Sequence, residues 1–244
     1  MRFRRLSAFT LIEMLLVVAI LSLLISIVLP TMAQTRQVTK NSVCASNLRL
    51  IHSATVSYTV SNRAIIPASR AWVGGNFADI NSVRNGTLYS YMGKNESAYI
   101  CPLFMETPRS WWTSNYGGKN YQTYTTIAFT YSLNEYAGSH DWNGKPGLRS
   151  FNRADEPNKL HLYSDENPWT IPTLSNHPIN NGAMGVGKYG PTNTGSIIDS
   201  LGSFHSPNGG NLDDGSSTVV FFDGHTELVH VSQSKEVVTP RRYK

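Results

Sequence analysis

The stretch FTLIEMLLVVAILSLLISIVL, from Phe9 to Leu29, decides the architecture of this 244-residue chain. It contains one charged side chain, Glu13, and the short segment before it carries Arg2, Arg4 and Arg5. As an α-helix the stretch rises about 30 Å, the thickness of the apolar core of a bilayer. Basic residues before a span keep the N-terminus on the cytoplasmic side. We therefore expect a transmembrane helix over 9–30, with the rest of the chain beyond the membrane.

Two interpretations of this segment compete. A secretory signal peptide would be cut after the apolar run, and Thr31-Met32-Ala33 before Gln34 has the small residues that such a cut requires. Against it, the apolar run is longer than a usual signal peptide and contains a carboxylate. A permanent membrane anchor fits the length, but a carboxylate inside a membrane is costly without a partner. Glu13 therefore needs a specific role.

The residues Ala8-Phe9-Thr10-Leu11-Ile12-Glu13 resemble the type IV prepilin signature. The resemblance implies that a prepilin peptidase cuts between Ala8 and Phe9 on the cytoplasmic side, and that Phe9 is then N-methylated. Ala8 departs from the family, which usually has Gly there, but it is also small. Pro30 stands where pilins commonly have a proline that kinks the helix. The expected organisation begins with a leader, 1–8, ahead of the transmembrane helix.

The resemblance also implies a function. It implies that the chain is a structural subunit of a type IV pilus-like or type II secretion pseudopilus filament. Such a subunit is first anchored in the bacterial inner membrane with its head in the periplasm, and is then assembled into an extracytoplasmic filament. The expected partners are the prepilin peptidase, other pilin or pseudopilin subunits, the inner-membrane assembly machinery and the lipid bilayer. Glu13 would pair with the free amine of Phe9 on a neighbouring subunit, which matches a charge in an apolar environment and sets subunit register.

An amphipathic pattern continues beyond the apolar run. Gly is absent from residues 31–62, and apolar or small residues recur there with the spacing of one helix face. This stripe consists of Cys44, Leu48, Ile51, Thr55 and Tyr58. We expect one long helix over about 9–62, whose second half packs its stripe onto a globular head, as in the lollipop shape of pilins.

The head is expected to cover residues 63–244. A short helix is predicted at 88–92, and long loops at 70–86, 105–124, 138–158 and 166–216. Apolar runs rich in β-formers predict strands at 125–133, 160–164, 218–222 and 225–231. Asp223-Gly224 between the last two runs is typical of a two-residue hairpin turn. The fold class is therefore α+β, a long helix packed on an antiparallel β-sheet.

The chain has two cysteines. Cys44 lies on the inward stripe, and Cys101 follows an apolar segment of the head. In an oxidising periplasm they are expected to form a disulfide between helix and head, although two buried free thiols remain the alternative. Two cysteines alone are too few for a metal site, so no metal is expected there.

The head carries a second resemblance. Its segments CASNLRL (44–50), Ile100-Cys101-Pro102, YSLN (131–134) and His205 ahead of Phe222-Asp223-Gly224-His225 are similar to heads of prepilin-like proteins abundant in planctomycete-like bacteria. The spacing from His205 to Asp223 is longer here than in those proteins. The insertion contains the oxygen-rich loop 208–215, where Asn208, Asn211, Asp213 and Asp214 are either calcium ligands or, as we prefer, solvated loop residues.

No catalytic motif of a common enzyme class occurs in the sequence. The adjacent carboxylates Asp165-Glu166 and Asp213-Asp214 are read first as loop residues, because neighbours in an extended chain point apart. We therefore expect no enzyme and no cofactor. The alternative is a membrane-tethered or secreted enzyme or carbohydrate-binding protein that uses the 63–244 head. The aromatic residues Trp111, Trp112, Tyr116, Tyr121 and Tyr124 are a candidate sugar-binding or subunit-contact surface, although we prefer to read them as core and turn anchors.

The net charge of +5 does not indicate nucleic-acid binding. Three of the 21 basic residues lie in the leader, which has no acidic residue. Without them the excess of basic over acidic side chains falls to 2. The basicity is partly a signal of membrane topology, and nucleic acid is not expected as a partner.

Overall fold

We analysed a computed structural model that describes residues 9–75, 79–108, 113–116, 119–123, 126–138, 147–169, 182–185, 199–207 and 209–238. The chain divides into two compact units, Met1–Thr39 and Lys40–Lys244. The described helices are α1 (Leu11–Ser61), α2 (Ile80–Asn85) and α3 (Ser234–Val238), with 3₁₀ turns η1 (Glu96–Tyr99), η2 (Phe104–Glu106), η4 (Phe151–Arg153) and η5 (Val231–Gln233). The strands are β1 (Thr113–Tyr116), β2 (Lys119–Thr123), β3 (Tyr131–Asn134), β4 (His161–Asp165), β5 (Ala183–Met184), β6 (Ser216–Phe221) and β7 (Thr226–His230).

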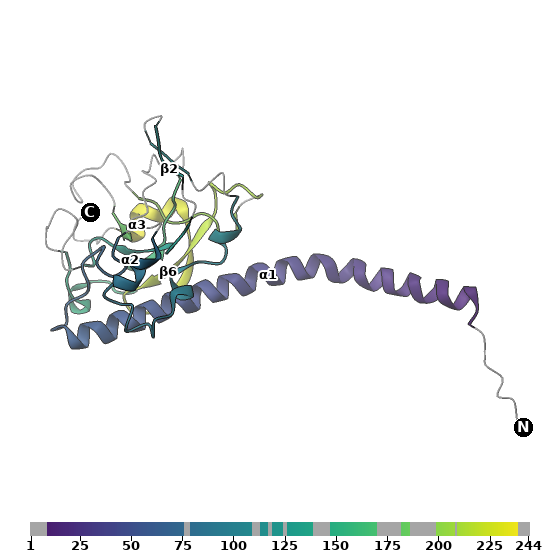
Figure 1. The fold of residues 1–244 in the computed structure, drawn as a ribbon, viewed down its shortest axis with the longest axis horizontal. Helices are drawn as coiled ribbons and strands as arrows, with labels where there is room; N and C mark the ends of the chain where they lie inside the picture. The colour runs from purple at the N-terminus through teal and green to yellow at the C-terminus, as the bar shows by residue number, and fades with distance from the viewer. Residues whose placement is uncertain are drawn as a thin grey trace, which may run out of the picture. The chain divides into compact units, whose positions relative to one another are not determined.

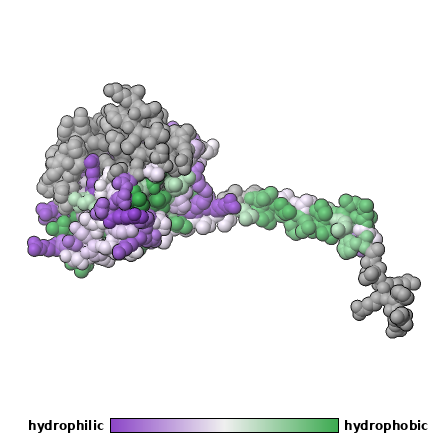
Figure 2. All heavy atoms as spheres, in the orientation of Figure 1, coloured by the Kyte–Doolittle hydropathy of each residue, from purple (hydrophilic) through white to green (hydrophobic). Residues whose placement is uncertain are grey.

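Helix α1 confirms the expected long N-terminal helix. It begins at Leu11 and ends at Ser61, within two residues of the predicted limits. It passes through Pro30 as helix, and the predicted kink at that residue stays a prediction. The apolar side chains of its first part, from Leu11 to Leu29, are exposed to their surroundings, and Figure 2 shows them as a continuous hydrophobic surface.

The second part of α1 packs onto the sheet with the predicted stripe. Cys44, Leu48, Ile51 and Thr55 are fully buried. This part of the helix contacts the turn between β6 and β7, where Arg49 donates to Thr226 and His52 lies 3.2 Å from the Phe222 carbonyl (Figure 1). The Thr55 hydroxyl hydrogen-bonds the Tyr163 hydroxyl of β4 at 2.8 Å. The stripe therefore does what its spacing predicts: it forms one wall of the core of the head.

The sheet of the head makes the fold α+β, as expected. Among the described residues five strands lie in the order β5-β3-β4-β6-β7. The pairs β3–β4, β4–β6 and β6–β7 are antiparallel, but β5 pairs in parallel with β3. The sheet is thus mixed, and the expectation of a purely antiparallel sheet is corrected at this edge. The two-residue strand β5 lies in a segment that the sequence predicts as loop.

An aromatic cluster fills the space between the sheet and the segments that follow α1. The fully buried Trp72 stacks on Tyr99 with ring centroids 5.8 Å apart and meets Tyr163 edge-on at 4.9 Å. Its indole N–H donates to the carbonyl of Gly182 at 2.6 Å. Buried tryptophans usually need such a polar partner. Trp72 thereby ties the loop after α1 to the segment that leads into β5.

The hairpin between β6 and β7 is confirmed, with a loop one residue longer than predicted. The Phe221 amide donates to the His225 carbonyl at 3.0 Å, which closes a loop of three residues. The Gly224 amide donates to the Phe221 carbonyl at 3.0 Å, and Gly224 has φ +90°. A turn followed by a left-handed residue is the common geometry of three-residue hairpins.

A Gly224→Ala variant is expected to lose about 1–2 kcal/mol of unfolding free energy. An alanine has to adopt the left-handed region, and its Cβ would lie 3.0 Å from Cε1 of His52. Gly93 is the matched control, since it has φ +65° and an added methyl group there would meet nothing within 4 Å. Urea unfolding of the full chain in detergent, followed by tryptophan fluorescence, should give a larger loss for Gly224→Ala than for Gly93→Ala. Equal losses of unfolding free energy in the two variants would show that the contact with His52 does not destabilise the Gly224→Ala variant.

Several elements of the head differ from the prediction. The helix expected at 88–92 is wrong: these residues form turns, and the helix lies earlier, at α2. Asp79 begins α2 by accepting a hydrogen bond from the Asn81 amide at 2.9 Å, and Gly86 ends it. The hairpin of β1 and β2 lies in the loop predicted at 105–124. The sequences TSNY and KNYQT contain no alternation of apolar and polar residues, which is the pattern from which strands are recognised.

Candidate functional site

The N-terminal end of α1 places Glu13 against Thr10. The amide and the hydroxyl of Thr10 each donate to Oε2 of Glu13 at 2.8 Å, and the Glu13 amide donates back to the Thr10 hydroxyl at 3.3 Å. This reciprocal pattern is a capping box, which satisfies backbone amides at a helix start. The spacing Thr-x-x-Glu signals it in the sequence, and it adds a role within the chain to the intersubunit role expected for Glu13. Ala8, the residue before the expected cut, lies outside the described residues.

The rest of the first unit is suited to an apolar environment. In the described part of the chain, one helical stretch, Leu11–Leu29, is long and apolar enough to cross a membrane. Leu11 is 78% exposed in the isolated chain, and the apolar side chains around the helix are similarly uncovered. Such a surface requires lipid or other apolar helices around it.

A second feature lies inside the head, where four chemically reactive side chains from four separate segments meet. Cys44 comes from α1, Cys101 follows η1, and Asp165 ends β4. His205 is held by a bridge to Ser216, the first residue of β6. All four side chains are fully buried. We call this group the buried cluster: Cys44, Cys101, Asp165 and His205.

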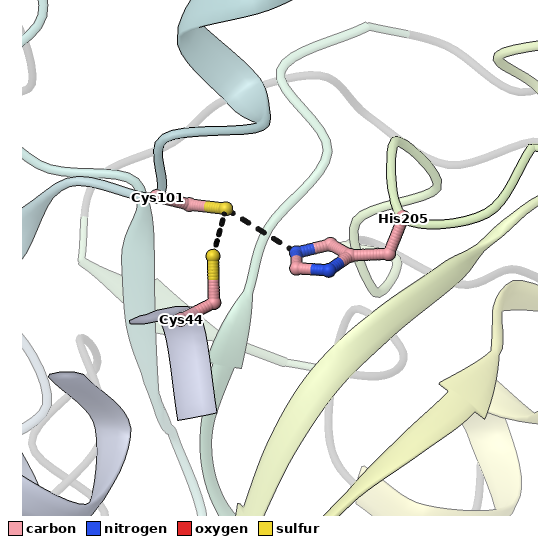
Figure 3. Close-up of side chains that lie close together, drawn as sticks. All are labelled: Cys44, Cys101 and His205. Atoms are coloured by element: carbon pink, nitrogen blue, oxygen red, sulfur yellow. Dashed lines mark hydrogen bonds between the residues drawn. The ribbon is translucent and has the colours of Figure 1, made fainter. Parts of the chain in front are cut away.

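The reactive atoms of the buried cluster point toward one another, as Figure 3 shows for three of them. The sulfur atoms of Cys44 and Cys101 lie 2.6 Å apart, and Sγ of Cys101 lies 3.3 Å from Nε2 of His205. The same Nε2 lies 2.9 Å from Oδ2 of Asp165. The buried cluster is therefore a continuous network of polar contacts, closed off from solvent.

The imidazole of His205 is fixed on both sides. Its Nδ1 lies 2.9 Å from Oδ1 of Asn41 and 3.2 Å from the Thr218 hydroxyl. Burial lowers the pKa of His205, but hydrogen bonds with Asp165 and Cys44 outweigh burial and raise that pKa to about 9. Burial raises the pKa of Asp165 against the opposing hydrogen bond with His205. The ring is thus oriented with Nε2 toward the rest of the buried cluster.

The two cysteines differ in their acidity. Burial raises the pKa of the Cys44 thiol, but hydrogen bonds with Cys101 and His205 outweigh it and lower that pKa to about 7. Burial raises the pKa of Cys101 well above its ordinary value. Both residues are free thiols in the structure. The two sulfurs are close to each other but not bonded in the structure, so the disulfide between Cys44 and Cys101 stays a prediction.

The buried cluster offers two kinds of chemistry. Two adjacent thiols can be oxidised to a disulfide, and two thiolates with an imidazole and a carboxylate can hold a metal ion. One ligand atom each from Cys44, Cys101 and His205 lies within 4.8 Å of the others. The sequence predicts a link between the two cysteines but none between them and His205. No spacing signal joins all three, because they come from distant segments of the chain.

The carboxylate pairs separate as expected, but Asp165-Glu166 is not in a loop. Asp165 contacts His205 from the end of β4, whereas Glu166 accepts a hydrogen bond from the Ser132 hydroxyl. Both are buried, because the strand continues into a bridge between Glu166 and Leu201. The prediction of loop residues is therefore wrong for this pair.

The oxygen-rich loop 208–215 is partly described. Oδ1 of Asp213 accepts a hydrogen bond from the Trp169 indole at 3.0 Å, and Oδ1 of Asp214 lies 3.0 Å from Nε2 of His230. Asn208 lies outside the described residues, as do Trp111 and Trp112. The calcium hypothesis and the sugar-binding hypothesis thus stay untested. Within the described residues both aspartates contact side chains of the head.

Comparison with known proteins identifies the N-terminal segment. A model of the prokaryotic N-terminal methylation motif matches residues 4–29. This is the prepilin-type motif, and it covers the capping box and the apolar part of α1. No curated protein matches the chain, and no solved structure matches it. The motif supports a type IV pilin-like or pseudopilin class of subunit, and the apolar helix is consistent with membrane anchoring.

Proposed function

We propose that this protein is a structural subunit of a type IV pilus-like or type II secretion pseudopilus filament. The observation that carries the proposal is the methylation motif at residues 4–29, in register with the uncovered apolar helix of α1. In this proposal a prepilin peptidase removes residues 1–8 on the cytoplasmic side, and Phe9 becomes the methylated N-terminus. Before assembly the subunit is anchored in the inner membrane with its head in the periplasm.

Assembly follows from the apolar surface. Packing the Leu11–Leu29 segments of many subunits side by side covers side chains that a single chain leaves exposed. Glu13 then needs a charged partner in an apolar surrounding, and the amine of Phe9 on a neighbouring subunit supplies it. We also propose that the head is similar to the heads of planctomycete-type prepilin-like proteins. In this proposal the head does not act as an enzyme.

The N-terminal residue of the mature protein tests the proposal. Mass spectrometry of the chain isolated from membranes should find N-methyl-phenylalanine at Phe9. A mature N-terminus at Gln34 would indicate ordinary signal-peptide cleavage and overturn the filament function, and an intact Met1 would indicate an unprocessed anchor. An Ala8→Leu variant, which puts a bulkier residue before the cut, is the control and should accumulate with Met1 retained.

A further inference from the structure

The buried cluster has the composition of a metal site rather than of an isolated cysteine pair. Two sulfurs and one imidazole nitrogen lie within 4.8 Å of one another, and a carboxylate oxygen of Asp165 contacts the same nitrogen. All four side chains are fully buried. Sulfur and nitrogen ligands in a four-coordinate arrangement are what Zn²⁺ prefers. A disulfide would account for the two sulfurs alone and would give no role to the contact of His205 with Sγ of Cys101.

The ligand atoms lie at or inside the separations of a zinc site, so binding of an ion requires small outward shifts. With zinc–ligand bonds of about 2.0–2.3 Å, the ligand atoms of a tetrahedral site lie about 3.3–3.8 Å apart. Sγ of Cys101 is 3.3 Å from Nε2 of His205, and that nitrogen is 2.9 Å from Oδ2 of Asp165. The two sulfurs, 2.6 Å apart, would separate by about 1 Å when an ion enters between them.

The residues around the buried cluster orient its ligands. Nδ1 of His205 is held by Oδ1 of Asn41 at 2.9 Å and the Thr218 hydroxyl at 3.2 Å, so Nε2 is the nitrogen that is directed at the rest of the buried cluster. Nε2 lies 2.9 Å from Oδ2 of Asp165, a hydrogen-bonding distance, so a proton is shared between them, and an ion that binds here takes the place of that proton. A hydrogen bond from the outer nitrogen of a ligating histidine is the usual second contact in metal sites. The Thr130 hydroxyl donates to the other oxygen, Oδ1 of Asp165, at 3.4 Å.

We propose that the buried cluster is a structural Zn²⁺ site, with Sγ of both cysteines, Nε2 of His205 and Oδ2 of Asp165 as its four ligands. The ion replaces the thiol protons and any proton on Nε2, which pass to solvent, and no ligand is oxidised. Its four ligands come from α1, the segment after η1, β4 and the bridge before β6. The ion thus clamps the helix to the sheet. This proposal does not depend on filament assembly.

Cobalt spectroscopy tests the site directly. The full chain in detergent is reduced with a phosphine, stripped with a chelator and titrated with Co²⁺. One equivalent should produce the visible bands of tetrahedral cobalt and a near-ultraviolet sulfur-to-cobalt band, both removed by one equivalent of Zn²⁺. A spectrum of six-coordinate cobalt without the sulfur band, or no binding by the reduced chain, overturns the proposal.

Variants locate the ligands. Asp165→Asn and His205→Asn should each weaken Co²⁺ binding by about tenfold or more, since each removes one of four ligands. Asp213→Asn and His52→Gln change the same residue types outside the buried cluster and should leave the titration unchanged. Near-ultraviolet circular dichroism of each variant verifies that the head is folded. Equal binding by the ligand variants and the wild-type chain contradicts the assignment.

The disulfide is the competing state of the same two sulfurs. The chain extracted from membranes is alkylated before reduction, and its metal content is measured in parallel. One zinc per chain, with the thiols becoming alkylated only after chelation, supports the proposal. Two sulfurs that resist alkylation until they are reduced, without bound zinc, show the disulfide predicted from the sequence and overturn the metal site.

Discussion

A Glu13→Gln variant is expected to be processed and inserted into the membrane normally but to enter filaments at least about tenfold less than the wild-type chain. The substitution keeps the shape of the side chain and removes its charge. In the proposed filament this leaves the amine of Phe9 on the neighbouring subunit without its partner in an apolar environment. The measurement is the amount of subunit in sheared filaments relative to the membrane fraction, by immunoblot.

The capping box allows a control that an alanine variant does not, because the charge of Glu13 and its hydrogen bonds with Thr10 can be removed separately. Glutamine at position 13 can still accept the hydrogen bonds from Thr10 that begin α1. A Thr10→Val variant does the opposite, because it removes the hydroxyl of the capping box and retains the charge of Glu13. If the charge acts between subunits, Glu13→Gln fails in assembly and Thr10→Val assembles. If Glu13 serves only to begin the helix, the order is reversed and the proposed intersubunit pair is refuted.

The features that the sequence predicts correctly are those that depend on the spacing of residues close together in the chain. The apolar run and the stripe from Cys44 to Tyr58 specify both parts of α1, because helix geometry fixes which side chains share a face. The hairpin at Asp223-Gly224 is equally local. In each case the signal lies within a few turns of the chain, and for the stripe of α1 the burial in the structure follows it.

The buried cluster is not predictable in the same way. Cys44 and Cys101 can be paired from the sequence, since the chain has two cysteines. Asp165 has the pattern of a loop carboxylate, but the sheet continues through it and brings it against His205. Contacts between such distant segments depend on the order of strands in the sheet. The sequence does not show this order, because strands as short as β5 leave no recognisable pattern. The hairpin of β1 and β2 is not predicted because its sequences, TSNY and KNYQT, lack an alternation of apolar and polar residues.

Acidification below pH 6.5 is expected to destabilise the head through His161. This residue begins β4, is fully buried, and lies with Nδ1 3.3 Å from Nδ2 of Asn134. Burial lowers its pKa from 6.5 to about 3, against an opposing backbone hydrogen bond with Val237. Below pH 6.5 the unfolded chain therefore binds a proton that the folded chain excludes. Above pH 6.5 neither state binds it, and His161 contributes no pH dependence.

The size of this effect follows from proton linkage. The free energy of unfolding should fall by about 1.4 kcal/mol for each pH unit between 6.5 and 3, which is about 2 kcal/mol at pH 5. Urea unfolding of the full chain in detergent at pH 7.5 and pH 5 measures it. A His161→Gln variant cannot take up this proton, so its loss between the two pH values should be smaller than that of the wild-type chain by about 2 kcal/mol.

Tyr163→Phe is the matched control for His161, because Tyr163 is a fully buried neighbour in the same strand. Removing its hydroxyl breaks the 2.8 Å hydrogen bond with Thr55 and should cost about 1 kcal/mol at both pH values. The difference between pH 7.5 and pH 5 should then equal that of the wild-type chain. If His161→Gln retains the full wild-type pH dependence, the proton is taken up elsewhere, and a neutral buried His161 is not the cause of the acid sensitivity.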